Sequence, residues 1–362
     1  MNYPLWGRGV FVMNEMWGDT DRNGTQKEAG CMSTGAIAVC GPTFLDVVMA
    51  GMPHAPVLGE EMWVDSSALT AGGAANQAVA VARLGHPVEL ITRLGNDRAG
   101  QIVRSVLEEN KVGTAYANSV ERQSVTVALA WDADRAMVTH GSDEGGVLPE
   151  SFTPSVLIAD LRAIDKNVEV VKQWRARGTK VIGDVGWDST GAWRTSDLLP
   201  LEHCDYFVPN ETEILHYARC FDVRQAVSMI GQLVETDARI VVTRGGRGVA
   251  LGPENYQTLP GIAAHVVDPT GAGDAFSAGL AVAVANGATD SEAVSFALLL
   301  GALSVTKTGG AGSTPTASEL TKMIEELDIP GSYDLGFVHQ FVKTFEFKNQ
   351  IVSSDETLKQ TK

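Results

Sequence analysis

A glycine-rich turn followed by a small-residue helix contains the residues of this chain best suited to chemistry. Gly271, Ala272 and Gly273 form the turn, which leaves backbone N–H groups open to an approaching anion. The helix expected to follow, over residues 275–286, directs its positive dipole end at the same place. Asp274 adds one carboxylate to that positive pocket. The combination predicts transfer of a phosphoryl group to a hydroxyl group, with Asp274 as the base.

The longer run around this turn resembles the C-terminal signature of the ribokinase-like (PfkB) carbohydrate kinases. Residues 268–276 read Asp-Pro-Thr-Gly-Ala-Gly-Asp-Ala-Phe, and the family signature is Asp-Thr/Pro-Thr-Gly-Ala-Gly-Asp-x-Phe. An isolated turn whose aspartate merely caps a helix is the alternative, and the length of the match disfavours it. The resemblance spans roughly residues 34–320. It implies a three-layer α/β/α sandwich with a central, mostly parallel sheet and a small β-sheet lid, and an ATP-dependent reaction.

Two further motifs imply a binding site for the sugar acceptor. In the family, a Gly-Gly…Asn segment binds sugar hydroxyls, and Gly72, Gly73 and Asn76 stand in that segment here. The Asn76 amide both donates and accepts hydrogen bonds, which suits a pair of hydroxyls. Asp46, expected at the edge of the sheet, occupies the position that holds two sugar hydroxyls in the family. Phe44 replaces a substrate-binding asparagine of ribokinase, which argues against ribose. The alternatives are close helix packing by small residues and a loop cap at Asp46.

Two motifs in the second half of the chain imply ATP and Mg²⁺. Asn210 and Glu213 match the family's Asn-x-x-Glu, which orders Mg²⁺ and its waters near the phosphates. Mg²⁺ keeps much of its water shell, so an indirect contact with Glu213 is physically reasonable. Thr243, Gly245 and Gly248 match Thr-x-Gly-x-x-Gly, a loop that contacts the nucleotide phosphates. Taken alone, a helix N-terminus at Asn210 and a simple hairpin turn explain these residues equally well.

A monovalent cation site beside the anion-binding turn is implied by one more segment. Residues 304–313 parallel the ribokinase segment that ligates such a cation through backbone carbonyls. Carbonyl ligation leaves little side-chain signature, so the assignment of K⁺ stays open. The residues implied, partly through their carbonyls, are Asp268, Thr270, Ser304, Lys307, Gly309 and Ser313.

The composition argues against several other classes of protein. The chain has 362 residues, a net charge of −16 and an isoelectric point near 4.8, which disfavours a nucleic-acid or anionic-membrane surface. Its four cysteines form neither a Cys-x-x-Cys pair nor a zinc pattern, so a reduced, cytoplasmic chain is expected. The apolar stretches at 275–288 and 294–305 are too short to span a bilayer. No Walker A sequence and no early Gly-x-Gly-x-x-Gly turn are present.

Alternating strands and helices from residue 35 onward predict a parallel sheet covered on both faces. Helices are expected at residues 75–84, 97–109, 168–176, 212–217, 275–286 and 291–307. Strands are expected at residues 36–41, 88–92, 180–184, 206–209, 239–243 and 266–268. The strand-rich segments 47–69 and 116–140 break the alternation and predict a small projecting antiparallel sheet. In the resembling family this sheet is a lid over the sugar, often shared across a dimer, so a homodimer through the lid is implied.

The domain boundaries follow from where this pattern starts and stops. Residues 32–327 are expected to form the kinase domain. Residues 1–31 mix Gly, Asn, Asp and Trp without a period, so we expect a flexible extension or a native start at Met32. Residues 328–362 are expected to form a C-terminal extension with a loose, polar end.

These motifs predict an ATP-dependent kinase for an unphosphorylated sugar or sugar acid, and two alternatives stay open. A nucleoside kinase of the adenosine type needs an aromatic slot for the base; Phe44 and Trp187 allow one, although Trp187 is expected to pack in the core. A non-catalytic sugar-binding or regulatory protein on the same fold is disfavoured by Asp274 and its intact turn. Phosphosugar acceptors are disfavoured because residues 72–76 contain no Lys or Arg. The expected partner is a small-molecule sugar, with no nucleic acid and no membrane.

Overall fold

The computed structural model describes residues 18–20, 26–28, 35–131, 134–234, 237–307 and 310–345. The chain divides into two compact units, Met1–Ser33 and Thr34–Lys362. In the first unit, β1 (Gly18–Thr20) and β2 (Gln26–Glu28) pair antiparallel. The prediction of a flexible segment at residues 1–31 lies mostly outside the described residues, and so does the prediction of a loose C-terminal end.

The second unit is built around a central sheet. Its described strands are β3 (Ile37–Cys40), β6 (Val88–Ile91), β11 (Val156–Asp160), β12 (Lys180–Asp184), β13 (Tyr206–Phe207), β14 (Arg239–Thr243), β15 (Val249–Gly252) and β16 (Gln257–Leu259). Their order across the sheet is β16-β15-β14-β13-β12-β11-β3-β6. The strands from β14 to β6 are parallel, and β15 and β16 are antiparallel. Every residue of β3 is buried, as expected for a parallel sheet covered on both faces.

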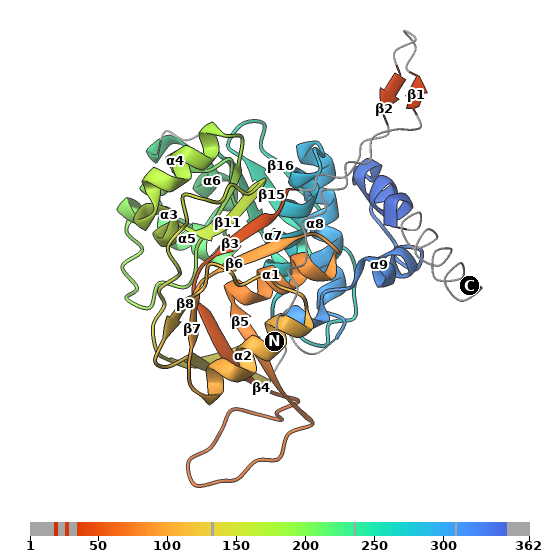
Figure 1. Ribbon diagram of the computed structural model, residues 1–362. Helices are drawn as coiled ribbons and strands as arrows, with labels where there is room; N and C mark the ends of the chain where they lie inside the picture. The colour runs from red at the N-terminus through yellow and green to blue at the C-terminus, as the bar shows by residue number, and fades with distance from the viewer. Residues whose placement is uncertain are drawn as a thin grey trace, which may run out of the picture. The chain divides into compact units, whose positions relative to one another are not determined.

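Helices cover both faces of this sheet (Figure 1). The described helices are α1 (Ala74–Arg83), α2 (Arg98–Glu109), α3 (Leu161–Lys166), α4 (Val168–Ala176), α5 (Glu211–Ala218), α6 (Val223–Leu233), α7 (Ala272–Ala285), α8 (Asp290–Ser304) and α9 (Ala317–Ile324). One layer contains α1, α7 and α8, which pack on one another, and the other contains α3 to α6. Small and apolar residues bury most of α7 and α8 on all sides. The predicted α/β/α sandwich with a mostly parallel sheet is confirmed.

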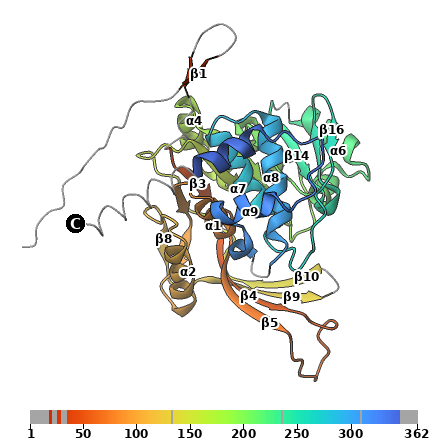
Figure 2. The ribbon, with the colours of Figure 1, turned by 90° about the vertical axis from the view of Figure 1, so that its right-hand side faces the viewer.

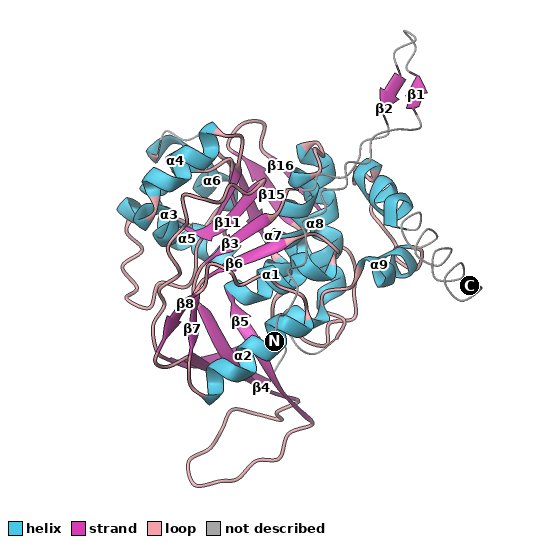
Figure 3. Cartoon of the chain, in the orientation of Figure 1, coloured by secondary structure: helices cyan, strands magenta, loops and turns pink. Residues whose placement is uncertain are grey.

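The predicted small sheet is present and projects from the sandwich (Figure 2). It contains β4 (Thr43–Ala50), β5 (Ser66–Gly73), β9 (Ser124–Trp131) and β10 (Asp134–His140), in the order β10-β9-β4-β5. We call this four-stranded sheet the lid. A long loop joins β4 to β5 (Figure 3). Because β4 starts at Thr43 and β5 ends at Gly73, the lid begins earlier and ends later than the predicted segment 47–69.

Short elements connect the layers. They are the parallel pair β7 (Arg93–Gly95) and β8 (Asn118–Val120), and the 3₁₀ helices η1 (Thr195–His203), η2 (Gly245–Arg247) and η3 (Gly310–Ser313). η2 and η3 contain residues predicted to contact the nucleotide and a cation.

Two expectations from the sequence are wrong. Residues 266–268 form no strand. The N–H groups of Val267 and Asp268 both donate to the Val305 carbonyl, so this segment is hydrogen-bonded to the residue after α8 and not to a neighbouring strand. Trp187 does not pack in the core, because 66% of it is exposed. Its ring makes edge contacts with Trp193 and His216, at 5.3 and 5.8 Å between centroids.

The chain after α8 also departs from the expected helix at residues 291–307. α8 ends at Ser304, and η3 and α9 follow. Further on, Phe337 and Phe341 are buried and contact Phe296 of α8, so this part of the predicted C-terminal extension packs on the sandwich. Within the described residues, no helix is long and apolar enough to cross a membrane.

Candidate active site

Asp274 lies in the first turn of α7, at the end of the anion-binding turn. Gly271 is the N-cap and has φ of 80°, a left-handed conformation that only glycine adopts readily. Among the described residues, the backbone N–H of Gly273 has no hydrogen-bond acceptor, and Gly273 is exposed. Asp274 itself is half-buried, so part of the residue contacts the protein and part stays accessible to a ligand. The turn can therefore receive an anion next to a carboxylate, as the sequence predicted.

Two neighbouring amide side chains of α1 hold the Asp274 carboxylate. Burial raises the pKa of Asp274 to about 6, and hydrogen bonds from Asn76 and Gln77 and the charge of Arg135 oppose that rise. The Gln77 amide also donates to the Asp184 carboxylate at the end of β12, at 3.0 Å. Burial and the charges of nearby acids raise the pKa of Asp184 well above its usual value. A base with a pKa near 6 is ionised at neutral pH and still accepts a proton readily.

The predicted acceptor residues of the lid lie beside this base. Burial, and after it the charge of Asp274, raise the pKa of Asp46 on β4 to about 7, although the charge of Arg135 opposes the rise. A Cβ atom at Gly72 of β5 would overlap the Asp46 carboxylate, so glycine is needed for this close approach. A Cβ atom at Gly73 would overlap the Phe44 ring. The structure thus brings Asp46, Gly72, Gly73 and Asn76 together around Asp274, although Asp46 lies on a lid strand rather than at the edge of the central sheet.

The pairing register shows which lid residues share a face with Asp46. Directly paired residues of neighbouring strands point to the same side of a sheet, and side chains alternate along a strand. The row through Asp46 is polar and consists of Thr70, Asp46, Thr126 and Thr139. The adjacent row, on the opposite face, is apolar and consists of Leu69, Val47, Val127 and Val138. The face that contains this polar row belongs to the site, and we call it the polar face of the lid. The next row on the same face is apolar and consists of Ala68, Val48, Ala128 and Met137.

Asn210 and Glu213 form a capping box at the N-terminus of α5. The Asn210 side chain accepts from the Glu213 N–H at 2.9 Å, and Glu213 Oε2 accepts from the Asn210 N–H at 2.8 Å. Burial raises the pKa of Glu213 to about 7, against the hydrogen bonds from Asn210. The helix-terminus interpretation is therefore correct for both side chains. The second carboxylate oxygen of Glu213 makes no hydrogen bond within the described residues and fits a contact with a metal-bound water.

The predicted nucleotide loop lies directly beside this capping box. Thr243 ends β14, bridges to Asn210 and donates its N–H to the Pro209 carbonyl at 2.9 Å. Gly245 starts η2 and Gly248 follows it. The structure therefore brings Asn210, Thr243, Gly245 and Gly248 together at the ends of β13 and β14.

Two arginines within the nucleotide loop were assigned no role from the sequence. Arg244 and Arg247 both form ion pairs with Glu211, the first residue of α5. The Arg244 pair has an N–O distance of 3.6 Å. Both arginines belong to the loop that matches the phosphate-binding motif. Their pairing with Glu211 depends on a contact between β14 and α5 that no local pattern specifies.

The residues implied for K⁺ are only partly brought together. Asp268 is buried, and its N–H donates to the Val305 carbonyl. Its side chain accepts from the Thr270 N–H at 2.9 Å. Ser313 of η3 is buried as well, and next to it Thr314 Oγ1 is buried without a hydrogen-bond partner among the described residues. A cation or water near Thr314 would satisfy that oxygen. Arg83 Nε donates to the Thr314 carbonyl at 2.5 Å, so that carbonyl already has a cationic partner, and the Thr314 hydroxyl is the oxygen that could take a further ligand.

The other implied K⁺ ligands use their side chains elsewhere. The Ser304 hydroxyl donates to the Gly301 carbonyl at 2.9 Å, within its own helix. Lys307 Nζ donates to Glu319 Oε1 at 3.0 Å. The Lys307 side chain therefore cannot serve a cation, whereas the Ser304 hydroxyl oxygen keeps its acceptor lone pairs. Gly309 lies outside the described residues.

The donor set fits a Mg²⁺ ion that arrives with the nucleotide. Among the described residues, no group of three or more His, Cys, Asp or Glu side chains could hold a metal ion. Mg²⁺ in nucleotide sites is bound by one or two carboxylates together with waters and phosphate oxygens, so a complete protein cage is not required. The buried carboxylate of Glu213 supplies such a donor.

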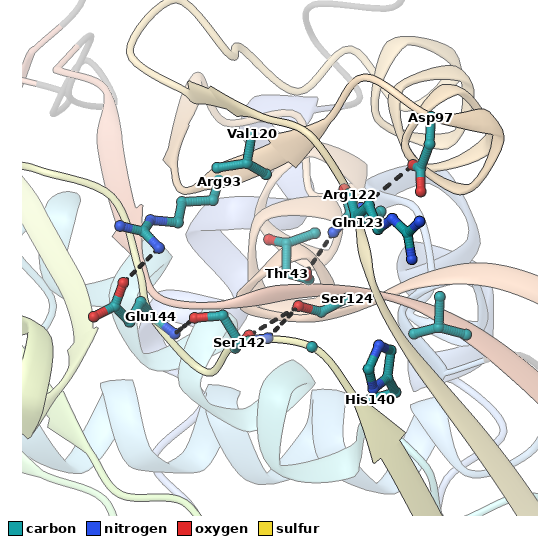
Figure 4. Close-up of a pocket in the computed structure, with 12 residues that line it drawn as sticks. Thr43, Arg93, Asp97, Val120, Arg122, Gln123, Ser124, His140, Ser142 and Glu144 are labelled. Atoms are coloured by element: carbon teal, nitrogen blue, oxygen red, sulfur yellow. Dashed lines mark hydrogen bonds and ion pairs between the residues drawn. The ribbon is translucent and has the colours of Figure 1, made fainter.

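A cavity of about 280 Å³ lies elsewhere, at the base of the lid (Figure 4). Arg122 and His140 flank its opening, and both are exposed. Arg93 and Glu144 form an ion pair on the opposite side. None of the predicted site residues lines this cavity. It is therefore separate from the candidate active site.

The sequence analysis missed three side chains around the base: Gln77, Asp184 and Arg135. Gln77 follows Asn76 directly, so the motif itself contained that signal. Asp184 ends a predicted strand at the edge where ligands bind in open α/β sheets, which was a usable signal as well. Arg135 had none, because only the pairing of β10 with β9 places it on the polar face of the lid.

Comparison with known proteins places this arrangement among sugar kinases. A profile described as pfkB family carbohydrate kinase matches residues 58–317. The ribokinase of Lactococcus lactis is 29% identical over 307 residues, which cover 81% of this chain and 98% of that protein. The fructokinase of Vibrio alginolyticus is 25% identical over 280 residues, which cover 70% of this chain and 91% of that protein.

Solved structures of similar proteins share the fold. The structure of Arabidopsis thaliana ribokinase complexed with ribose and ATP has a TM-score of 0.66 and 26% identity, covering 80% of this chain and 99% of that one. A Vibrio cholerae fructokinase double mutant in its fructose-, ADP- and potassium-bound form has a TM-score of 0.65 and 22% identity, covering 81% and 99%. The second similarity, at that identity, concerns the fold alone.

Proposed function

The chain belongs to the pfkB family of carbohydrate kinases, and from that premise we propose that it transfers the γ-phosphoryl group of ATP to a hydroxyl group of an unphosphorylated sugar or sugar acid, with Asp274 as the base. Phosphotransfer to an alcohol group is the activity of the family and of its ribokinase and fructokinase relatives. The observation that carries the proposal is the Asp274 carboxylate, held by Asn76 and Gln77 at the N-terminus of α7.

The acceptor binds between the lid and α7 in this proposal. Asp46 and Asn76 accept and donate hydrogen bonds to sugar hydroxyls, and Gly72 and Gly73 let the sugar approach the backbone. Asp274 takes the proton of the reacting hydroxyl as the oxygen attacks the γ-phosphorus. The polar face of the lid covers the reacting groups and excludes water, which limits hydrolysis of ATP.

The backbone N–H groups of Gly271, Ala272 and Gly273 stabilise the charge on the transferred phosphoryl group, helped by the α7 dipole. The nucleotide phosphates lie along Asn210, Thr243, and the loop from Gly245 to Gly248. Bound Mg²⁺ would neutralise charge on the nucleotide phosphates, and Glu213 is the residue that would hold it through water.

Glu213 contacts Mg²⁺ through water in this proposal, because only one of its carboxylate oxygens is used in the capping box at the start of α5. K⁺ activation is also proposed, supported by the buried Asp268 and by the unsatisfied Thr314 hydroxyl. The fructokinase structure named above holds ADP and potassium ion, and the ribokinase structure holds ATP and ribose.

A homodimer through the lid is the proposed assembly. The apolar row of the lid exposes 55% of Leu69 and 69% of Val138 on its two edge strands. An exposed apolar sheet face with open edges is stabilised when a second copy covers it.

An assay of ADP release with Mg-ATP and K⁺ tests the proposed function. The acceptor panel contains pentoses, hexoses, keto-deoxy sugar acids and nucleosides. We expect one sugar or sugar acid to turn over well above the ATPase background. Turnover of a nucleoside alone would select the adenosine-type alternative. ATP binding without turnover of any acceptor would favour the non-catalytic alternative.

A further inference from the structure

A long exposed loop joins the lid strands β4 and β5, and we call its residues 51–65 the arm. The arm contains no helix or strand and projects from one end of the lid (Figure 3). Residues 53–61 are exposed without interruption, so this part of the arm packs little against its own chain. Loops of this length without secondary structure are uncommon in compact domains and usually have a function.

The tip of the arm exposes large apolar side chains to solvent. The Glu60 N–H donates to the Val57 carbonyl at 3.2 Å, and Gly59 has φ of 83°, so the tip is a tight turn whose glycine adopts the left-handed conformation. Leu58 in this turn is fully exposed, and 87% of Trp63 is exposed. Exposed apolar groups that lie close together mark a surface that binds a partner.

The arm is also acidic. It contains Glu60, Glu61 and Asp65 and no Lys or Arg. Within the described residues, neither Glu60 nor Glu61 forms an ion pair, and both are exposed. The complement of the arm is therefore a surface with positive charge next to exposed apolar groups.

The cavity at the base of the lid offers the positive charge. Arg122 and His140 flank its opening, and neither side chain has an ion-pair or hydrogen-bond partner among the described residues (Figure 4). The acids that line the cavity are already used, because Glu144 pairs with Arg93 and Asp97 caps α2. Arg122 and His140 can therefore both donate to carboxylates that arrive from outside.

Exposed apolar surface adjoins this cavity on the same face of the lid. His140 of β10 pairs with Val125 of β9, and both line the cavity. Val138 lies two residues from His140 along β10, so it shares that face, and 69% of it is exposed. Thr126, the residue after Val125, pairs with Asp46 and points to the opposite face. His140 and Val138 therefore lie on the lid face that is turned away from the acceptor site.

We propose that the arm of one copy of this chain docks on the lid of a second copy, with its acidic residues at Arg122 and His140 and its apolar residues on the exposed apolar row of that lid. Two copies related by a twofold axis then exchange arms, and the contact forms twice. The inference rests on the homodimer through the lid proposed above. It adds which segment and which surface hold that dimer together.

The dimensions of the lid favour a second copy over the arm's own chain. Thr43 at the start of β4 lines the cavity, whereas the arm begins after Ala50 at the end of that strand, about 24 Å away along the strand. The arm also points away from the base of its own lid (Figure 2). When two lids lie antiparallel, the end of one lies over the base of the other. An extended arm, which reaches about 20–25 Å, then meets the cavity of the other copy.

Sedimentation velocity measures the dimer dissociation constant of wild type and of variants with reversed charge. Arg122→Glu makes the cavity acidic, and the double variant Glu60→Lys, Glu61→Lys makes the arm basic. Either change places like charges at the contact, so each should raise the Kd at least about tenfold. Trp63→Ala should raise the Kd by about tenfold as well, because exposed aromatic residues dominate the energy of interfaces.

A mixture of the two charge-reversed proteins tests the contact between copies. The Arg122→Glu protein has an acidic cavity and an acidic arm, and the double variant has a basic cavity and a basic arm. In a mixed dimer each arm meets a cavity of opposite charge, so the Kd of the mixture should return to within about threefold of wild type. Local unfolding of the lid in either variant could not be reversed by mixing.

Two control variants match these changes in net charge at exposed positions outside the lid. Lys322→Glu in α9 matches Arg122→Glu, and Glu254→Lys between β15 and β16 matches a single reversal in the arm. Neither Lys322 nor Glu254 forms an ion pair within the described residues. Both controls should leave the Kd of the dimer unchanged.

The outcomes separate this inference from the proposals on which it rests. A dimer whose Kd is unchanged by both charge reversals, or a mixture that stays as dissociated as its components, overturns the docking of the arm and leaves the homodimer in place. A wild type that is monomeric at every concentration overturns the docking and the homodimer together, and leaves the cavity to a small anion, which titration with inorganic phosphate would detect. Phosphotransfer is tested separately by the acceptor panel, and its failure leaves the docking of the arm intact.

Discussion

Gly72→Ala tests the geometry of the acceptor site with one added methyl group. A Cβ atom at this position would overlap the Cγ and both carboxylate oxygens of Asp46. The two residues lie on paired strands, β5 and β4, whose backbone register leaves little room for either to retreat. The carboxylate must therefore rotate away, and the sugar loses the hydrogen bonds that it makes with Asp46.

The size of the effect follows from those bonds. A hydrogen bond to a charged group contributes about 1.5–3 kcal/mol, and 1.4 kcal/mol corresponds to about a tenfold change in binding. Loss of one such bond predicts an increase in the acceptor KM of about 10–100-fold. The nucleotide loop lies on other elements, so the KM for ATP should change by less than about twofold.

Steady-state kinetics with the acceptor found in the panel measures both KM values. Gly186→Ala is the matched control, because a Cβ atom there meets nothing within 4 Å. Asp46→Ala should resemble Gly72→Ala, and the double variant should be no worse than either single one. An acceptor KM for Gly72→Ala that equals that of Gly186→Ala would refute the contact between Asp46 and the sugar.

Three further outcomes are expected. The kcat/KM of wild type should fall below about pH 6, because protonation of Asp274, whose folded pKa is about 6, removes the base; a pH–rate profile measures this. Asp46→Asn should raise the melting temperature at pH 8 more than at pH 5. The folded pKa of Asp46 is raised to about 7, so the carboxyl destabilises the fold increasingly as the pH rises from the unfolded pKa to about 7. Thermal unfolding at the two pH values measures the difference. Glu213→Gln should raise the Mg²⁺ concentration for half-maximal turnover about tenfold, as expected for a lost outer-shell carboxylate; a Mg²⁺ titration checks it, and an unchanged curve contradicts the assignment.

Local sequence patterns predicted the sandwich well. The expected strands at residues 180–184 and 239–243 and the helix at 168–176 agree with β12, β14 and α4 at both ends. Apolar runs and helical periodicity suffice for such elements, because burial on both faces of a parallel sheet leaves little choice. The strand expected at 266–268 failed, since two apolar residues before a turn do not reveal that their N–H groups bond to the end of α8.

The site was predictable where one motif contains several of its residues. Gly271 to Asp274 and Gly72 to Asn76 are contiguous, so the chemistry of each segment was visible in the sequence. The meeting of these segments with Asp46 depends on strand pairing in the lid, and Arg135 enters through the same pairing. The prediction for Trp187 was wrong. A large apolar residue just after a buried strand is expected to be buried, whereas this residue is mostly exposed.

Turnover of Asp274→Asn tests the central claim most directly. The variant keeps the shape of the side chain and removes its capacity to take a proton. Loss of a general base lowers turnover by about 10²–10⁴-fold, and we expect a loss in this range with ATP binding unchanged by calorimetry. Turnover within a few-fold of wild type would contradict Asp274 as the base, and with it the proposed mechanism.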